Sequence, residues 1–155
     1  SDGLGGVGLC QLTRPAPTAN QTWNWKDNVR GGWKLFLEKE AFARAYPGKQ
    51  RKGERFKGLV RAWNQARTAQ GLPAIPVELP DYTAEQLELD TLRGFNGYAN
   101  NLHEYRIRMQ GDQLWVTVSA DGNTARAEWE RIPAAERGAV GDRNYVDNVL
   151  AREDF

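Results

Sequence analysis

The sequence is short of cysteine and of long apolar runs. Its one cysteine, Cys10, excludes an intrachain disulfide, which suits either the cytosol or a protein delivered elsewhere that needs no oxidative folding. No run of about 18 apolar residues occurs, so we expect no membrane span. The first residues lack a basic segment followed by an apolar one, so they predict no ordinary secretory signal peptide.

Strong charge of one sign is also missing. The formal net charge of +1 argues against a nucleic-acid-binding protein. Basic residues do gather at residues 49–61, where we expect a solvated helix face; the alternative is a site for an anionic polymer. Apolar residues (40%) and charged residues (26%) are close to the averages for globular proteins, so we expect one folded domain over residues 1–155.

The first predicted helix covers residues 27–46, where apolar residues recur at helical spacing. Residues 1–27 are rich in Gly, Pro, Asn and Thr and predict a loop. Pro47 is expected to end the helix. The expected buried face consists of Val29, Trp33, Phe36, Leu37 and Ala41.

Further patterns predict a mainly α fold with one β-hairpin. A second amphipathic helix is expected over residues 54–70, a third begins at the capping-box pattern of residues 83–86, and a last one covers residues 144–153. Over residues 105–119 apolar side chains alternate around a Gly-Asp pair, which predicts one small antiparallel hairpin. A parallel sheet is not expected.

Three segments carry a resemblance to a known family. They are GVGLCQL at residues 6–12, FNGYANN at residues 95–101 and NYVDNVLAR at residues 144–152. Their order, with a tryptophan-containing loop and a helix after the first, resembles goose-type lysozymes and soluble lytic transglycosylases over about two-thirds of the chain. The resemblance implies a lysozyme-like helical domain, to which the hairpin is a small insertion.

The resemblance implies a peptidoglycan hydrolase, a muramidase that cleaves the β-1,4 bond between N-acetylmuramic acid and N-acetylglucosamine. Such chemistry needs a carboxylic acid with a raised pKa to protonate the leaving oxygen. An inverting enzyme also needs a carboxylate that activates water. The family's acid is a glutamate well before the glycine-rich motif, so we expect it upstream of Ser1 and the domain to be N-terminally incomplete.

The resemblance assigns a catalytic role to Asp2, which stands where goose-type lysozymes have a second acid that positions water. The alternative is a loop aspartate that caps a turn. Gln11 resembles the motif glutamine that binds the sugar N-acetyl group or the backbone beside the cleft; the alternative is a residue that pairs with loop backbone. Lytic transglycosylases lack the second acid, so Asp2 favours hydrolysis.

The second motif implies substrate contacts from Phe95, Asn96 and Tyr98, with Phe95 in place of the usual tyrosine. Trp23 is expected to offer an aromatic face to a sugar; the alternative is a core tryptophan. Asp2, Gln11 and Asn96 are expected to converge on one cleft.

Other reactive residue types receive structural interpretations. Cys10 is expected to be a small apolar filler, and His103 a polar residue at the surface or a helix end. Core positions are expected for Trp33 and Trp63. The carboxylates that we expect to be solvated are Glu38, Glu40, Glu104 and Glu128.

Two alternatives to a muramidase remain open: a lytic transglycosylase of the same fold and a non-catalytic glycan-binding module. No metal or cofactor is expected. The expected partners are peptidoglycan glycan strands and an immunity or inhibitor protein, as for an antibacterial effector or a phage-type lysin that acts in the periplasm or on the cell wall. Without its acid, this chain is expected to bind peptidoglycan fragments weakly and to cleave them poorly or not at all.

Overall fold

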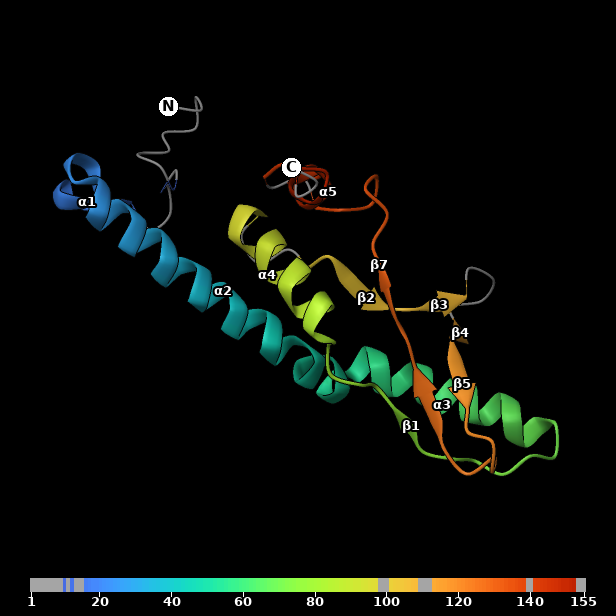
Figure 1. The fold of residues 1–155 in the computed structure, drawn as a ribbon. Helices are drawn as coiled ribbons and strands as arrows, with labels where there is room; N and C mark the ends of the chain where they lie inside the picture. The colour runs from blue at the N-terminus through green and yellow to red at the C-terminus, as the bar shows by residue number, and fades with distance from the viewer. Residues whose placement is uncertain are drawn as a thin grey trace.

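The computed structural model describes residues 10, 12, 16–97, 101–108, 113–138 and 141–152. Within these residues, five helices and seven short strands form an α-rich mixed fold. Figure 1 shows the long helix α2 crossing the molecule, with α1 at its outer end and the strands gathered with α3 at the other. A helix-rich fold with a small β component is thus confirmed.

Two helices occupy the region from residue 19 onward, α1 (Ala19–Trp23) and α2 (Trp25–Lys52). Thr18 and Gln21 form a capping box that begins α1, and the Asn24 side chain accepts from the backbone N–H of Lys26 to begin α2. The expected loop over residues 1–27 is therefore wrong from residue 19 onward, because these side chains satisfy the free N–H groups of two helix starts.

Helix α2 also runs past the expected stop at Pro47 and ends at Lys52. Proline costs an interior helix one hydrogen bond and clashes with the preceding turn. Pro47 is fully buried, so packing of its ring compensates for that cost, and the sequence signal for a helix end was wrong here.

The buried face of α2 differs from the expected one. Val29, Trp33 and Leu37 are 40%, 61% and 45% exposed, whereas Asn28 and Gly32 are buried. The expectation of a core position for Trp33 is wrong. Asn28 and Gly32 are covered because Cys10 lies against both of them, and hydrophobic spacing alone gives no sign of such contacts.

Helix α3 (Glu54–Ala69) agrees with the expected second helix. The connector after it is held by Asn64, whose side-chain amide donates to the carbonyl of Ile75 and accepts from its N–H, both at 3.0 Å. Phe56 on α3 packs in a core with Leu79 and side chains from the strands.

The strands are, in chain order, β1 (Val77–Glu78), β2 (His103–Tyr105), β3 (Ile107–Arg108), β4 (Gln113–Leu114), β5 (Val116–Val118), β6 (Ala125–Ala127) and β7 (Trp129–Arg131). The expected hairpin is present as the antiparallel pair β3 and β4, with Ile107 opposite Leu114. The expectation of a single hairpin is wrong, because β2 pairs with β7 and β5 with β6. In addition, β1 pairs in parallel with β6, so the expectation that no parallel sheet occurs is also wrong. The partners in the β2–β7 and β1–β6 pairs are distant in the sequence, and such pairing leaves no local periodic signal.

Helix α4 (Ala84–Gly97) begins with the predicted capping box: the backbone N–H groups of Thr83 and Gln86 donate to each other's side chains. It lies along α2 and carries α5 (Tyr145–Leu150) on its other side. A second core of Leu89, Leu102 and Val146 joins α4 to α5.

Candidate functional site

Three of the six predicted site residues, Asp2, Gln11 and Tyr98, lie outside the described residues. The other three are placed. Trp23 is the last residue of α1 and is 88% exposed. Phe95 and Asn96 are half-buried near the end of α4.

An aromatic row connects α2 to α4 at this place. The Trp33 and Phe36 rings stack with centroids 5.8 Å apart and planes 10° apart. The Phe36 and Phe95 ring centroids lie 6.0 Å apart at a tilt of 58°. We call Trp33, Phe36 and Phe95 the aromatic row. Trp33 at one end of the row is exposed, and Phe95 at the other end is half-buried.

Asn96, the next residue on α4, holds the loop before α5. Its Nδ2 donates to the carbonyl of Asp142 at 3.0 Å. Gly141 has a φ of +74°, and a Cβ there would lie 2.5 Å from the backbone oxygen of Asn96. Both the left-handed backbone and the close approach therefore require glycine at position 141.

Two buried arginines fix the same loop. The Arg93 guanidinium donates to the carbonyls of Gly138 and Asp142, each at 2.9 Å. Arg137 donates to the carbonyl of Arg143 at 2.8 Å and also pairs with the Asp147 carboxylate. Charge-assisted bonds of this kind are stronger than neutral ones, so the loop is held rigidly beside Asn96.

The first motif segment adjoins α2 just before the aromatic row. The Cys10 N–H donates to Oδ1 of Asn28 at 2.9 Å. A Cβ on Gly32 would lie 2.4 Å from the Cys10 sulfur, and a Cβ on Gly31 would lie 3.1 Å from Leu12. The contact at Gly32 is one helical turn from Phe36. Cys10 and Leu12 of the first segment thus contact α2, Phe95 of the second contacts α2 from α4, and Val146 of the third packs against Leu89 of α4.

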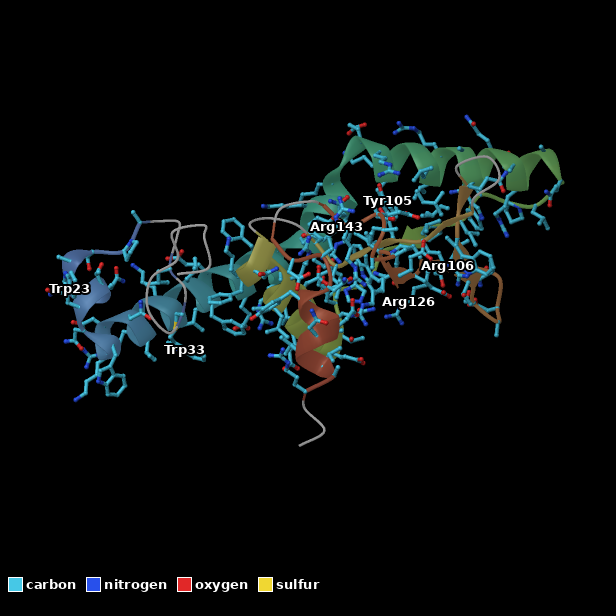
Figure 2. All side chains as sticks on the ribbon, turned by 90° about the horizontal axis from the view of Figure 1, so that it is seen from above. Trp23, Trp33, Tyr105, Arg106, Arg126 and Arg143 are labelled. Carbon is cyan, nitrogen blue, oxygen red and sulfur yellow. The ribbon has the colours of Figure 1, made fainter. Side chains whose placement is uncertain are left out.

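Trp23 does not join this group. The start of α2 at Trp25 is eleven residues from Phe36, about 17 Å along the helix axis. Figure 2 shows Trp23 at the outer tip of the molecule, with Trp33 between it and the body. Cys10 contacts α2 at Gly32 and Phe95 contacts it at Phe36, whereas Trp23 lies apart from both.

A cavity of about 510 Å³ lies elsewhere, at the opposite end of α2, and its lining includes Arg51, Phe56 and Asp81. The Arg51 guanidinium there already pairs with Asp81 at 2.7 Å and with the carbonyl of Leu79 at 2.9 Å. Among the described residues, neither the motif segments nor the aromatic row contributes to the lining of this cavity.

Sequence reasoning missed one buried polar network. Oδ2 of Asp90 on α4 pairs with Nδ1 of His103, and both side chains are buried. Oδ1 of Asp90 accepts the N–H of Leu102 at 3.0 Å and the Tyr82 hydroxyl at 3.4 Å. Burial raises the pKa of the Tyr82 hydroxyl far above its usual range, and the nearby Asp90 carboxylate adds to the effect. The surface position expected for His103 is wrong.

This network joins α4 to β2 and is closed to solvent, so its role is structural. Thirteen residues separate Asp90 from His103, and no local pattern relates such positions. The one available signal was an aspartate beside Leu89 on the apolar side of a predicted helix.

The carboxylates near the site have structural partners. Oδ1 of Asp142, beside Asn96, accepts the N–H of Asn144 at 2.8 Å, and its Oδ2 accepts from the Asn148 side chain at 3.2 Å. Glu40 pairs with Arg44 on the surface of α2. In the part of the chain that the structure describes, no group of three metal-ligating side chains occurs.

Comparison of this chain with protein-family models, with curated proteins and with solved structures gave no match. Among the described helices, none has an apolar stretch long enough to cross a membrane.

Proposed function

We propose that this chain is part of a lysozyme-like muramidase, which cleaves the β-1,4 bond between N-acetylmuramic acid and N-acetylglucosamine in peptidoglycan. The observation that supports it is the meeting of the three motif segments. Residue 10 lies against Gly32 of α2, Phe95 of α4 against Phe36 of α2, and Val146 of α5 against Leu89 of α4.

In this proposal Phe36, Phe95 and Asn96 form one wall of the substrate groove, and the exposed Trp33 lies outside it. Apolar faces suit the C–H faces of pyranose rings, and amide groups suit the N-acetyl substituents of amino sugars. The rigid loop at residues 138 and 141–142 supplies backbone close to Asn96. A wall held by buried arginines keeps its geometry when substrate binds.

The proposal assigns the general acid to residues outside those described. Asp142, the carboxylate beside Asn96, already accepts hydrogen bonds from the Asn144 N–H and the Asn148 side chain, and proton donation needs a carboxyl with a raised pKa within reach of the leaving oxygen. The same observation favours the second candidate, a glycan-binding module that does not cleave. Action in the periplasm or on the cell wall, and an immunity or inhibitor partner, belong to the proposal and follow from the resemblance alone.

The first test is binding to insoluble, purified peptidoglycan sacculi, measured by co-sedimentation. We expect Phe95→Ala and Asn96→Asp each to weaken binding, and Leu72→Ala, an exposed position after α3 (46% exposed), to leave it unchanged. Thermal unfolding of each variant separates lost binding from lost folding. A wild-type chain that does not sediment with sacculi would refute both candidates.

The second test is turnover, measured as clearing of a sacculus suspension, with analysis of the products. We expect the chain alone to clear walls poorly, because loss of a general acid costs a factor of about 10²–10⁴. Clearing at ordinary lysozyme rates would place the acid within the chain, and Glu38, Glu40 and Glu104 would be mutated first. Products with 1,6-anhydro-muramic ends would identify a lytic transglycosylase instead.

A further inference from the structure

An exposed apolar stripe runs along the first half of α2. Trp25, Val29, Trp33 and Leu37 follow one another at four-residue spacing and are 63%, 40%, 61% and 45% exposed. Residues four apart lie on the same side of a helix. The two indoles are eight residues apart, about 12 Å along the axis. Contiguous exposed apolar surface of this kind marks an interaction site more often than chance.

Cations accompany this stripe. Lys26, Arg30 and Lys34 also repeat at four-residue spacing, each one residue after a member of the stripe. Lys26 Nζ lies 5.7 Å from the Trp25 ring centroid, and Arg30 pairs with Asp27 at 3.0 Å. Glu38 follows Leu37 in the same register. With three cations against the two carboxylates of Asp27 and Glu38, the surface keeps a small positive charge around Lys26 and Lys34 and complements an anionic ligand there.

We propose that the stripe is a second glycan-binding surface, which holds a carboxylate-bearing amino-sugar strand outside the groove at Asn96. The inference rests on the proposed function and extends it, because the stripe is continuous with the aromatic row through Trp33. Trp25 and Trp33 stack against sugar rings, and Lys26 and Lys34 bind the carboxylates of the strand. The site therefore selects long strands over short fragments.

Two other occupants fit the surface less well. The core of a protein interface is depleted in lysine, whereas Lys26 and Lys34 directly flank the indoles. Helices that lie on anionic membranes carry Lys and Arg over their polar face, whereas α2 also carries Asp27, Glu38 and Glu40. A ligand that combines sugar rings with scattered carboxylates matches both the apolar stripe and the cations beside it.

The test compares three variants with the wild-type chain: Trp25→Ala/Trp33→Ala, Lys26→Gln/Lys34→Gln and the control Phe42→Ala. Phe42 is on the same helix and is 63% exposed, but it lies off the stripe. The probes are insoluble peptidoglycan sacculi and an uncharged hexamer of N-acetylglucosamine, with affinity measured by co-sedimentation and by calorimetry.

We expect the double tryptophan variant to bind both probes about tenfold more weakly. The double lysine variant should lose affinity for sacculi and keep its affinity for the uncharged hexamer. Phe42→Ala should bind like wild type, and all variants should unfold at similar temperatures.

The outcomes separate this inference from the proposed function. Wild-type binding that both double variants retain would overturn the inference alone, whereas no wild-type binding to either probe would overturn both proposals. Two results would assign the stripe to another occupant, provided that glycan binding stays intact in the tryptophan variant. If the wild type sediments with anionic phospholipid vesicles and the variant does not, the occupant is a membrane. If the wild type dimerises in analytical ultracentrifugation and the variant does not, the occupant is a second copy of the chain.

Discussion

The two ends of α2 use their aromatic and aliphatic residues in opposite ways. At the C-terminal end, the chain turns into α3 and the strands, and Phe56, Tyr105 and Leu114 are only 5%, 3% and 2% exposed. At the N-terminal end, Trp25 and Trp33 are both more than 60% exposed. We call these the closed end and the open end.

The difference separates stability from recognition. Apolar surface removed from water contributes about 25 cal/mol per Å² to folding, so the closed end stabilises the molecule. The exposed indoles of the open end contribute little to folding. Their apolar surface is still in contact with water, so burying it against a ligand would stabilise the complex. A protein that only needed to fold would gain by burying them.

The largest expected effect is at the closed end. Phe56→Ala should lower the free energy of unfolding by about 3–5 kcal/mol, because it leaves a cavity against Tyr105 and Leu79. Trp25→Ala at the open end should change it by less than about 0.5 kcal/mol. Urea unfolding measures both, and a comparable loss at the two positions would remove the distinction between the ends.

A smaller effect is expected where the loop meets the candidate site. Gly141→Ala should cost about 2 kcal/mol, because L-residues are strained at its φ of +74° and a Cβ would collide with the Asn96 backbone. The same variant should weaken binding to sacculi, since the loop must move away from Asn96. Gly122→Ala is the control for backbone strain alone, because Gly122 has a φ of +74° and a Cβ at that position would meet no atom within 4 Å. If neither Gly141→Ala nor Gly122→Ala changes binding to sacculi, the loop at Gly141 is not part of the site.

Alkaline pH should weaken the closed end first. Burial raises the pKa values of Tyr46, Tyr82 and Tyr105, so the folded state holds these protons more tightly than the unfolded state does. The stabilisation is complete below the unfolded tyrosine pKa of about 10 and is lost as the pH rises above it. Urea unfolding at pH 8 and above pH 10 should show this loss, and Tyr82→Phe should reduce it. An equal pH dependence in wild type and Tyr82→Phe would exclude Tyr82 as a cause.

The sequence predicted what depends on local order. The capping box at Thr83 and Gln86, the helix from Glu54 and an antiparallel hairpin within residues 105–119 were all predicted from residues close together in the chain. The side-chain chemistry of caps and turns acts over a few residues, so its signal is readable without the fold.

What could not be predicted depends on partners far apart. The hydrophobic spacing predicted a buried Trp33. That prediction was wrong, because the spacing gives no sign that residue 10 packs against Asn28 and Gly32. The Asp90–His103 pair and the parallel pairing of Val77 with Ala125 likewise have no local signature. For the candidate site, Asn96 and Phe95 were predicted by resemblance and adjoin the first segment through α2, whereas the buried arginines that hold their loop were not foreseen.

The smallest expected change in the free energy of unfolding is that of Gly32→Ala, which tests whether residue 10 packs against α2 at the open end. Gly32→Ala gains helix propensity of about 1 kcal/mol, but its Cβ would lie 2.4 Å from the Cys10 sulfur and 2.6 Å from the Cys10 Cβ. The two terms oppose each other, so the free energy of unfolding should change little, while Cys10 is displaced and its thiol reacts faster with a disulfide reagent. Gly58→Ala is the matched control in α3, where the nearest atom to a new Cβ is the flexible end of Arg61 at 3.9 Å. That variant should stabilise the protein by about 0.5–1 kcal/mol and leave the thiol rate unchanged. If Gly32→Ala stabilises by the same amount and leaves Cys10 equally protected, the first segment does not dock against α2, and the convergence that supports the proposed site would fail with it.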